Sequence, residues 1–190
     1  MNRLLLLLAL LVMAACSTPQ APTGEPAAVN DTTPAEWPVP DPADVSTLDG
    51  IMTAYYEVVS GPADEIRDWE RDKSLHVPGA QVVIMRSNDD GTPRIERMTI
   101  SDYHARQPGP AEAAFYEVEI NRAVRQHGST IHVWSTYEYR STPDGPSEGQ
   151  GVNSIELVWD GFRYWITSWS YDGRVDAPPV PSEYLPTSPG

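Results

Sequence analysis

Two side chains in the second half of the 190-residue sequence are candidates for a general base, His132 and Glu119. Acid–base catalysis needs such a group within hydrogen-bond reach of the substrate, and it needs a donor aimed at the negative charge that develops. Tyr137 and Tyr55 carry hydroxyl groups that could donate in this way. These four residues form the candidate catalytic set if the protein is an enzyme.

The same residues have structural interpretations, and we favour them. His132 lies one position away from the apolar Val133 face of a predicted strand, with no aspartate near it in the sequence, so a surface or packing role is favoured. Tyr55 lies on the apolar face of a predicted helix, where tyrosines usually belong to the core. The sequence therefore favours a protein without catalytic activity and leaves an enzyme as the alternative.

Four further residues are candidates for binding a ligand: Arg122, Asn153, Trp69 and Trp134. Simple alternation puts Arg122 on the apolar face of its strand and opposite to Glu119, where a guanidinium could bind a carboxylate. A role as an edge residue or in a structural ion pair is the favoured alternative for Arg122. Asn153 either orients a ligand or satisfies the backbone at a strand start. The two tryptophans either wall a pocket or belong to the core or a pairing surface.

No cofactor and no metal site is predicted. The four histidines, His76, His104, His127 and His132, have no metal-ligand spacing, and phosphate loops and dinucleotide fingerprints are absent from the sequence. The segment 145–149 matches G-x-S-x-G, but a nucleophile elbow needs a strand before it and a helix after it. A Pro-Asp-Gly turn precedes this segment and a strand follows, so we interpret it as a hairpin loop.

The amino terminus has the pattern of an export signal. One positive charge, Arg3, precedes an apolar run from Leu4 to Ala15, and small residues stand directly before Cys16. The run is shorter than the roughly 20 residues that a membrane-spanning helix needs. Residues 1–15 are therefore predicted to be a signal peptide.

The segment Met13-Ala14-Ala15-Cys16 resembles the bacterial lipobox. The resemblance implies that Cys16 is acylated and becomes the first residue of the mature protein. Ser17 in place of aspartate implies the periplasmic side of the outer membrane if the host is Gram-negative. We therefore expect a lipid-anchored lipoprotein of the cell envelope, with the membrane as a partner through lipid on Cys16.

Composition excludes some classes of partner. The chain has 13 Lys and Arg against 27 Asp and Glu, a net charge of −14, so no basic patch marks a nucleic-acid site. The same charge should keep the protein away from anionic lipid headgroups, which leaves the lipid as the anchor. Cys16 is the single cysteine, so an intramolecular disulfide cannot form.

Proline-rich segments delimit one predicted domain. Residues 16–45 are rich in Pro and Ala and hold no Lys or Arg, which predicts a disordered linker. Residues 173–190 form a Pro-rich tail that should be irregular. The fold is therefore expected in residues 46–172.

Within that domain the pattern predicts helices first and strands later. A helix begins at Ser46 and stops at Gly61-Pro62, and Asp64 is predicted to cap a second, short helix. A hairpin over 80–98 follows, then a short helix capped by Thr99 with Asp102. Four antiparallel strands complete an α+β layout, the last of them, 164–171, with Trp165 and Trp169 on one face.

This layout resembles the nuclear-transport-factor-2-like superfamily, including its SnoaL-like groups. The resemblance rests on the paired amino-terminal helices with Asp64–Trp69, on GSTIHVWSTYEYR (128–140) and on GVNSIELVWDGFRYWITSWSYD (151–172), and it covers 46–172. It implies a cone-shaped fold in which a curved antiparallel sheet packs on helices and a pocket opens on the concave face. Members include isomerases, dehydratases, cyclases and non-catalytic binding modules, so fold alone does not give the function.

The leading expectation is a lipid-anchored module that binds a small apolar or amphipathic ligand, or a protein partner. The first alternative is an isomerase- or dehydratase-type enzyme with a pocket His or Glu as base. The second is a scaffold that assembles as a homodimer through the outer sheet face.

Overall fold

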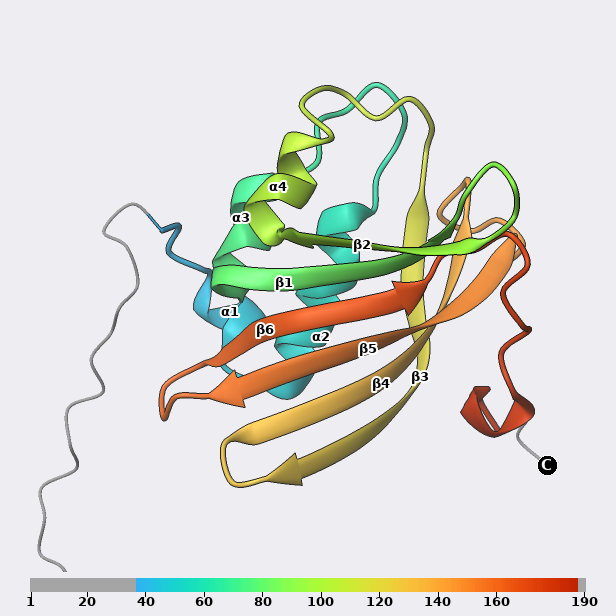
Figure 1. The fold of residues 1–190 in the computed structure, drawn as a ribbon. Helices are drawn as coiled ribbons and strands as arrows, with labels where there is room; N and C mark the ends of the chain where they lie inside the picture. Colours follow the sequence, from blue (N-terminus) through green and yellow to red (C-terminus); the bar gives the residue numbers. More distant parts are fainter. Residues whose placement is uncertain (1–36, 188–190) are drawn as a thin grey trace, which may run out of the picture. The chain divides into compact units, whose positions relative to one another are not determined.

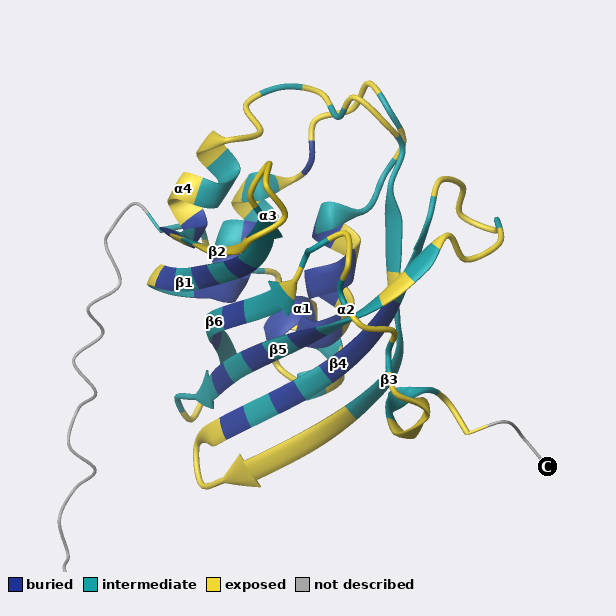
Figure 2. Cartoon of the chain, turned by 45° about the vertical axis from the view of Figure 1, so that its right-hand side comes forward, coloured by how far each residue is buried: buried dark blue, intermediate teal, exposed yellow. Residues whose placement is uncertain are grey.

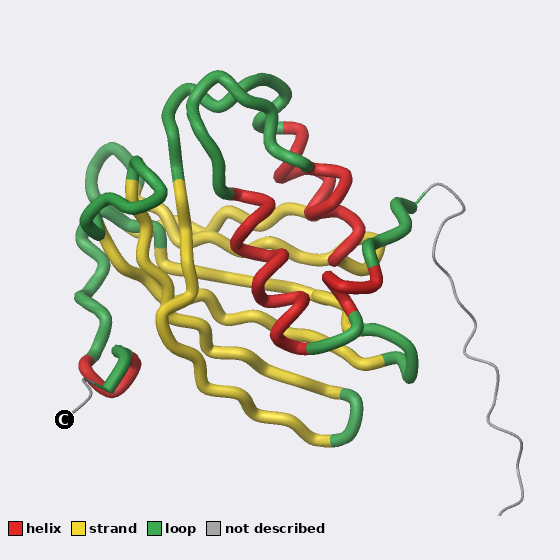
Figure 3. The backbone as a smooth tube through the Cα atoms, turned by 180° about the vertical axis from the view of Figure 1, so that it is seen from behind, coloured by secondary structure: helices red, strands yellow, loops and turns green. Residues whose placement is uncertain are grey.

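The computed structural model describes residues 37–187, so the predicted signal peptide, Cys16 and most of the predicted linker lie outside the described residues. One six-stranded sheet has the strand order β2-β1-β6-β5-β4-β3. The helices gather on one face of this sheet, and the sheet curves around them (Figure 1, Figure 3). The α+β class and the curved sheet packed on helices are thus confirmed.

The sheet is mixed rather than purely antiparallel. Its strands are β1 (His76–Ser87), β2 (Pro93–Thr99), β3 (Tyr116–His127), β4 (Thr130–Arg140), β5 (Gly149–Trp159) and β6 (Tyr164–Asp172). All neighbours are antiparallel except β1 and β6, which run parallel. The prediction of an antiparallel sheet is wrong at this pair, because the early β1–β2 hairpin joins the edge of the late four-stranded meander through a long crossover.

The longest helix, α2 (Leu48–Val59), provides the centre of the core. Thr47 caps it by accepting a hydrogen bond from the Gly50 N–H at 2.9 Å, one residue after the predicted start. The residues of its inner face are all buried: Ile51, Met52, Ala54, Tyr55, Tyr56 and Val58. They meet alternate residues of the sheet strands, whose buried and half-buried positions alternate along β4 and β5 (Figure 2).

An arginine terminates α2. The buried guanidinium of Arg67 donates to the carbonyls of Val59 at 3.1 Å, Gly61 at 2.8 Å and Pro62 at 3.0 Å. Carbonyls at a helix end have no partner within the helix, so a cation there supplies both hydrogen bonds and a favourable charge.

The next helix, α3 (Trp69–Leu75), begins later than predicted. Its cap is Asp68, which accepts from the Arg71 N–H at 2.9 Å. Asp64 does not cap a helix but occupies a turn with a positive φ of 63°, so that part of the prediction is wrong. The helix α4 (Ile100–Ala105) starts with the predicted capping box of Thr99 and Asp102.

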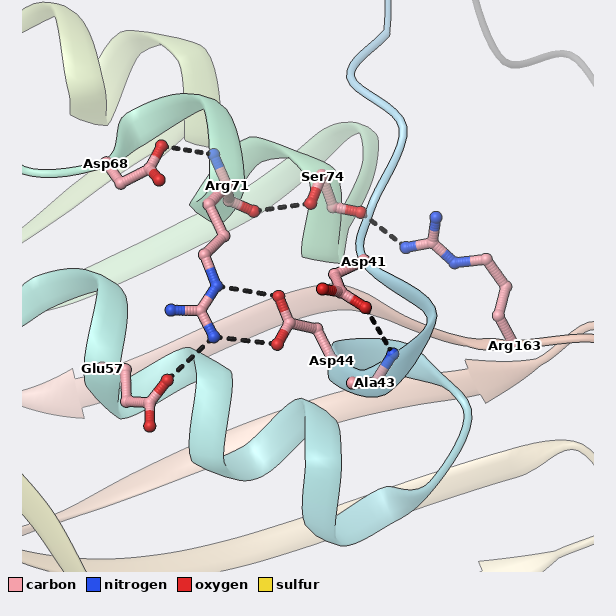
Figure 4. A network of polar contacts seen from close by, with 8 residues as sticks. All are labelled: Asp41, Ala43, Asp44, Glu57, Asp68, Arg71, Ser74 and Arg163. Carbon is pink, nitrogen blue, oxygen red and sulfur yellow. Dashed lines mark hydrogen bonds and ion pairs between the residues drawn. The ribbon is translucent and has the colours of Figure 1, made fainter.

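The domain also begins earlier than expected. The helix α1 (Pro42–Val45) packs on the core with Val45 buried, and the Trp37 indole donates to the His76 carbonyl at 2.9 Å. Arg71 of α3 contacts both carboxylate oxygens of Asp44 at 2.8 Å (Figure 4). The prediction of a linker through residue 45 is therefore wrong over 37–45, because an ion pair, a hydrogen bond and a buried apolar side chain hold that segment.

Two bulges change which side chains share a face. In β3 the register shifts at Ile120, so that Glu119 and Arg122 lie on one face, against the predicted opposite faces. In β6 the register shifts at Thr167, so that Trp165 and Trp169 lie on opposite faces, against the prediction. One extra residue reverses the facing of everything beyond it, and alternation in the sequence does not reveal it.

The carboxyl-terminal segment leaves β6 and crosses the sheet. It is irregular apart from the 3₁₀ turn η1 (Ser182–Tyr184), which lies beside β3. The Asn121 amide donates to the Tyr184 carbonyl at 3.0 Å. This segment therefore belongs to the packed domain and reaches the region of the candidate site.

Candidate functional site

A cavity of about 650 Å³ lies between the helices and the inner face of the sheet. Its aromatic lining comprises Tyr55, Tyr103, Phe115, Tyr137, Tyr139, Trp169 and Tyr171. The segment 173–179 lines another side. A concave space that combines several aromatic rings with polar groups could hold a small molecule.

Glu117 is the most unusual residue of this cavity. It keeps some exposed surface because it faces the cavity, but protein surrounds its carboxyl group on most sides. No described residue forms a hydrogen bond with that carboxyl group, and desolvation raises its pKa to about 8. Near neutral pH the group is therefore mainly a protonated acid.

Sequence reasoning missed Glu117. Tyr116, Val118 and Ile120 alternate along the sequence, which is typical of the core-facing side of a strand. In the structure, however, Val118 is 39% exposed and Glu117 faces inward. The available signal was the spacing Phe115-x-Glu117, which puts a ring and a carboxyl on one face. Acidic side chains rarely face the core of a protein, so this spacing alone does not predict that Glu117 points inward.

Tyr55 and Tyr137, the two predicted donors, both line the cavity. Tyr55 packs edge-on against Trp169 with ring centroids 6.2 Å apart, and burial raises the pKa of both tyrosines. The Tyr137 ring lies against Gly151, where a Cβ atom would come within 2.4 Å of the hydroxyl oxygen. Gly151 is therefore needed for Tyr137 to occupy this position.

Asn153 lines the cavity as predicted and continues into a buried chain of polar groups. Its amide donates to the Tyr56 hydroxyl at 3.3 Å, and that oxygen lies 2.6 Å from the Ser135 hydroxyl. Ser135 donates to Glu119 at 2.5 Å, so the single proton of Ser135 is used there and Tyr56 must donate to Ser135. The chain fixes the orientation of the Asn153 amide.

Glu119 and Arg122 end this chain away from the cavity. Arg122 lies 2.7 Å from Glu119 and 3.0 Å from Asp49, which is the structural ion pair that the sequence favoured. Burial raises the pKa of Glu119, while Ser135 and Arg122 act in the opposite direction. Neither residue lines the aromatic cavity, so the geometry brings neither to the candidate site.

His132 and Trp134 lie on the outer face of the sheet. The His132 Nε2 atom lies 3.0 Å from the Ser154 hydroxyl, and Trp134 packs against Tyr184 with ring centroids 5.8 Å apart. The favoured reading of His132 as a surface or packing residue agrees with this position. Both residues are outside the lining of the cavity.

Trp69 lies in a neighbouring site. It stacks on His104 with ring centroids 4.9 Å apart and donates to the Gln107 carbonyl at 3.2 Å. It lines a second cavity of about 630 Å³ beside the loop 108–113, not the aromatic cavity. Trp69 and Asn153 therefore line different cavities, and a role of Trp69 in binding a ligand stays a prediction.

Asp72 joins two histidines behind the cavity wall. Its carboxylate lies 2.7 Å from His104 Nε2 and 3.5 Å from His76 Nδ1. The hydrogen bonds define a neutral His76, because Nδ1 donates to the Asp72 carbonyl at 2.8 Å and Nε2 accepts from the Trp169 indole at 3.2 Å. Burial also lowers the pKa of His76. The cluster thus ties α3 to α4 and to β6.

Asp72 is the one member of that cluster lining the cavity within the described residues, since neither imidazole does so. Within residues 37–187 no three His, Cys, Asp or Glu side chains are placed to hold a metal ion together. Over the same residues no helix is long and apolar enough to span a membrane. The polar groups that the cavity offers a ligand are Glu117, Asp72, Asn153, Gln150, the Asp172–Arg174 pair and the tyrosine hydroxyls.

No protein-family model matches the chain, and no curated protein matches it. Among solved structures it is similar to one described as the beta subunit of an aromatic-ring-hydroxylating dioxygenase from Novosphingobium aromaticivorans, with 16% identity, a TM-score of 0.41, and coverage of 55% of this chain and 76% of that one. The Kfla4162 protein from Kribbella flavida is similar with 15% identity, a TM-score of 0.35, and coverage of 52% and 71%.

Proposed function

We propose that the protein is a lipid-anchored binding module that holds a small organic molecule in its aromatic cavity. The observation that carries this proposal is the position of Glu117, a mainly protonated carboxyl that faces a ring-lined space and has no hydrogen-bond partner among residues 37–187. The surrounding protein desolvates this carboxyl group without giving it a hydrogen-bond partner, so a ligand that pairs with it would gain a hydrogen bond in a poorly solvated place.

The arrangement favours binding over acid–base catalysis. A general base needs a group that faces the substrate, but His132 lies on the outer face and His104 is turned to Asp72 and Trp69. The second candidate function is an isomerase- or dehydratase-type enzyme. Its support is Glu117 itself, because a carboxyl group with a pKa of about 8 is suited to donate or accept a proton near neutral pH.

Filling the cavity is expected to abolish binding. Tyrosol, a neutral phenol of suitable size, should bind the protein with one-to-one stoichiometry in isothermal titration calorimetry. Val59→Trp puts a large ring into the lining and should weaken binding at least about tenfold, because the ligand and the ring need the same space. The matched control is Val118→Trp, at an exposed position on β3, which should bind normally.

Circular dichroism should confirm that both tryptophan variants remain folded. Saturable binding that Val59→Trp leaves unchanged would place the ligand elsewhere and contradict the proposal. A complete lack of tyrosol binding by the unchanged protein would also count against it.

Membrane attachment is proposed to depend on Cys16. Cys16→Ser is expected to move the full-length protein from the membrane fraction to the soluble fraction, because two or more acyl chains bind a bilayer firmly and a serine accepts none. Ser17→Ala, which keeps the cysteine, is the matched control and should stay with membranes. A Cys16→Ser protein that still sediments with membranes would refute the lipid anchor.

A further inference from the structure

We propose that the cavity is built for an organic cation, a molecule that joins a protonated amine or a quaternary ammonium group to a flat apolar body. This inference rests on the proposed function and names the class of its ligand. Three features of the described residues support it: the rings, the balance of charge around the cavity and the free carboxyl group of Glu117.

The rings supply attraction for a positive charge. Seven aromatic side chains line the cavity, and five of them are tyrosines. The face of an aromatic ring carries partial negative charge, so a cation at about 6 Å or less from the ring centre is attracted to it. Several rings around one cavity add their attractions, because each ring face that the cation approaches contributes.

Acidic side chains outnumber basic ones in the lining of the cavity. Glu117, Asp72 and Asp172 contribute carboxyl groups, and Arg174 is the single basic residue of the lining within residues 37–187. Arg174 is already paired, because its guanidinium donates to both carboxylate oxygens of Asp172 at 2.6 to 3.2 Å. An anionic ligand would thus meet carboxyl groups and no free cation.

Glu117 could pair with the cation among the aromatic side chains of the cavity. Its carboxyl group lies near enough to Tyr55, Tyr103, Tyr137 and Tyr171 to raise the pKa of each. An ammonium group beside it would donate a hydrogen bond to the carboxylate and offset the desolvation that now keeps the acid protonated. A neutral ligand gains only an ordinary hydrogen bond at this place.

Binding of a cation should therefore release a proton from Glu117. The other titratable or charged side chains around this carboxyl are the tyrosines of the cavity and Tyr56, with Asp72, Asp172 and Arg174 in the same cavity. Glu57, Glu119 and Arg122 line a neighbouring cavity that Glu117 also lines. Burial raises the pKa of Tyr55, Tyr56, Tyr103, Tyr137 and Tyr171 above 10, so these hydroxyls stay neutral over this pH range. A permanent cation brings no proton of its own. Its affinity should rise with pH up to about 8 and then level off, because it binds the ionised form of Glu117.

The first experiment compares three ligands of nearly equal shape by calorimetry at about pH 8.5. Tyramine is a cation, tyrosol is its neutral counterpart and 4-hydroxyphenylacetate is an anion. Tyramine is expected to bind at least about tenfold more tightly than tyrosol, and the anion most weakly. Glu117→Gln should reduce tyramine to the affinity of tyrosol, whereas Glu156→Gln, at a half-buried position of β5 outside the cavity lining, should change nothing.

The second experiment follows benzyltrimethylammonium from about pH 6 to 9. The expected gain in affinity is roughly 50- to 100-fold, the ratio of the ionised fractions of a group with a pKa of about 8, and it should vanish in Glu117→Gln. If tyrosol binds but tyramine binds no more tightly, this inference fails and the proposed function stands. If neither binds, both fail.

Discussion

The Glu117→Gln protein should be more stable than the unchanged protein at about pH 8.5, by as much as roughly 4 kcal/mol. Burial raises the pKa of Glu117 to about 8, above its ordinary value of 4.5, so the folded protein binds this proton more tightly than the unfolded chain. Each unit of difference is about 1.4 kcal/mol. The stabilisation is complete below pH 4.5, declines between 4.5 and 8, and is absent above that range.

Urea unfolding at about pH 5.5 and 8.5 measures this effect. The difference in free energy of unfolding between the variant and the unchanged protein should increase with pH, because glutamine does not titrate. Glu156→Gln, whose side chain is 46% accessible, is the matched control and should follow the unchanged protein. Equal pH dependence in the Glu117→Gln and unchanged proteins would show that the carboxyl group of Glu117 is not desolvated.

The second large effect is expected for Asp72→Ala, a loss of roughly 3 kcal/mol in the free energy of unfolding. The buried carboxylate of Asp72 holds His104 at 2.7 Å and lies beside the buried His76. Removing one partner of a buried pair leaves the other without compensation, and such changes cost about 3 to 5 kcal/mol. For a domain of this size the melting temperature should fall by roughly 6 to 12 °C.

The control for Asp72 is another paired acid at the surface. Asp49→Ala removes the partner of Arg122, but Asp49 is 90% exposed and the change should cost less than about 1 kcal/mol. A double-mutant cycle of Asp72→Ala with His104→Ala isolates their interaction, which should be at least about 1 kcal/mol. Additive effects of the two changes would contradict the role given to this pair.

Protonation of His76 should lower the stability of the protein at acid pH. Burial lowers its pKa below the ordinary 6.5, so its contribution to stability is present above pH 6.5 and is lost as the pH falls through its folded value. This direction is opposite to that of Glu117. Glu117→Gln should therefore remove the decline at high pH and leave the decline at low pH unchanged, which the same urea series measures.

The order of helices and strands could be predicted because most of these elements have a local sequence signal. The capping box of Thr99 and Asp102 and the run of apolar residues at helical spacing over 48–59 both led to helices that are present. The parallel pairing of β1 with β6 had no such signal, since it joins residues about 90 positions apart. The start of α3 was placed at Asp64 instead of Asp68, because either aspartate can cap a helix.

The candidate site was only partly predictable, for a physical reason. Tyr55, Tyr137 and Asn153 were candidates by residue type and position, and all three line the cavity. Glu117 was missed because an apolar alternation on the other face of β3 suggested the opposite orientation. Asp72 and His104 meet across 32 positions of sequence, so only the packing of α3 against α4 brings them together.

The most direct test of the central claim is the titration of the Glu117 carboxyl group itself, followed through its side-chain carboxyl ¹³C chemical shift. We expect a midpoint near pH 8 for the free protein and a lower midpoint when benzyltrimethylammonium saturates the cavity. A midpoint near 4.5 in the free protein would show that water or a protein group already solvates this carboxyl group, and it would contradict the account.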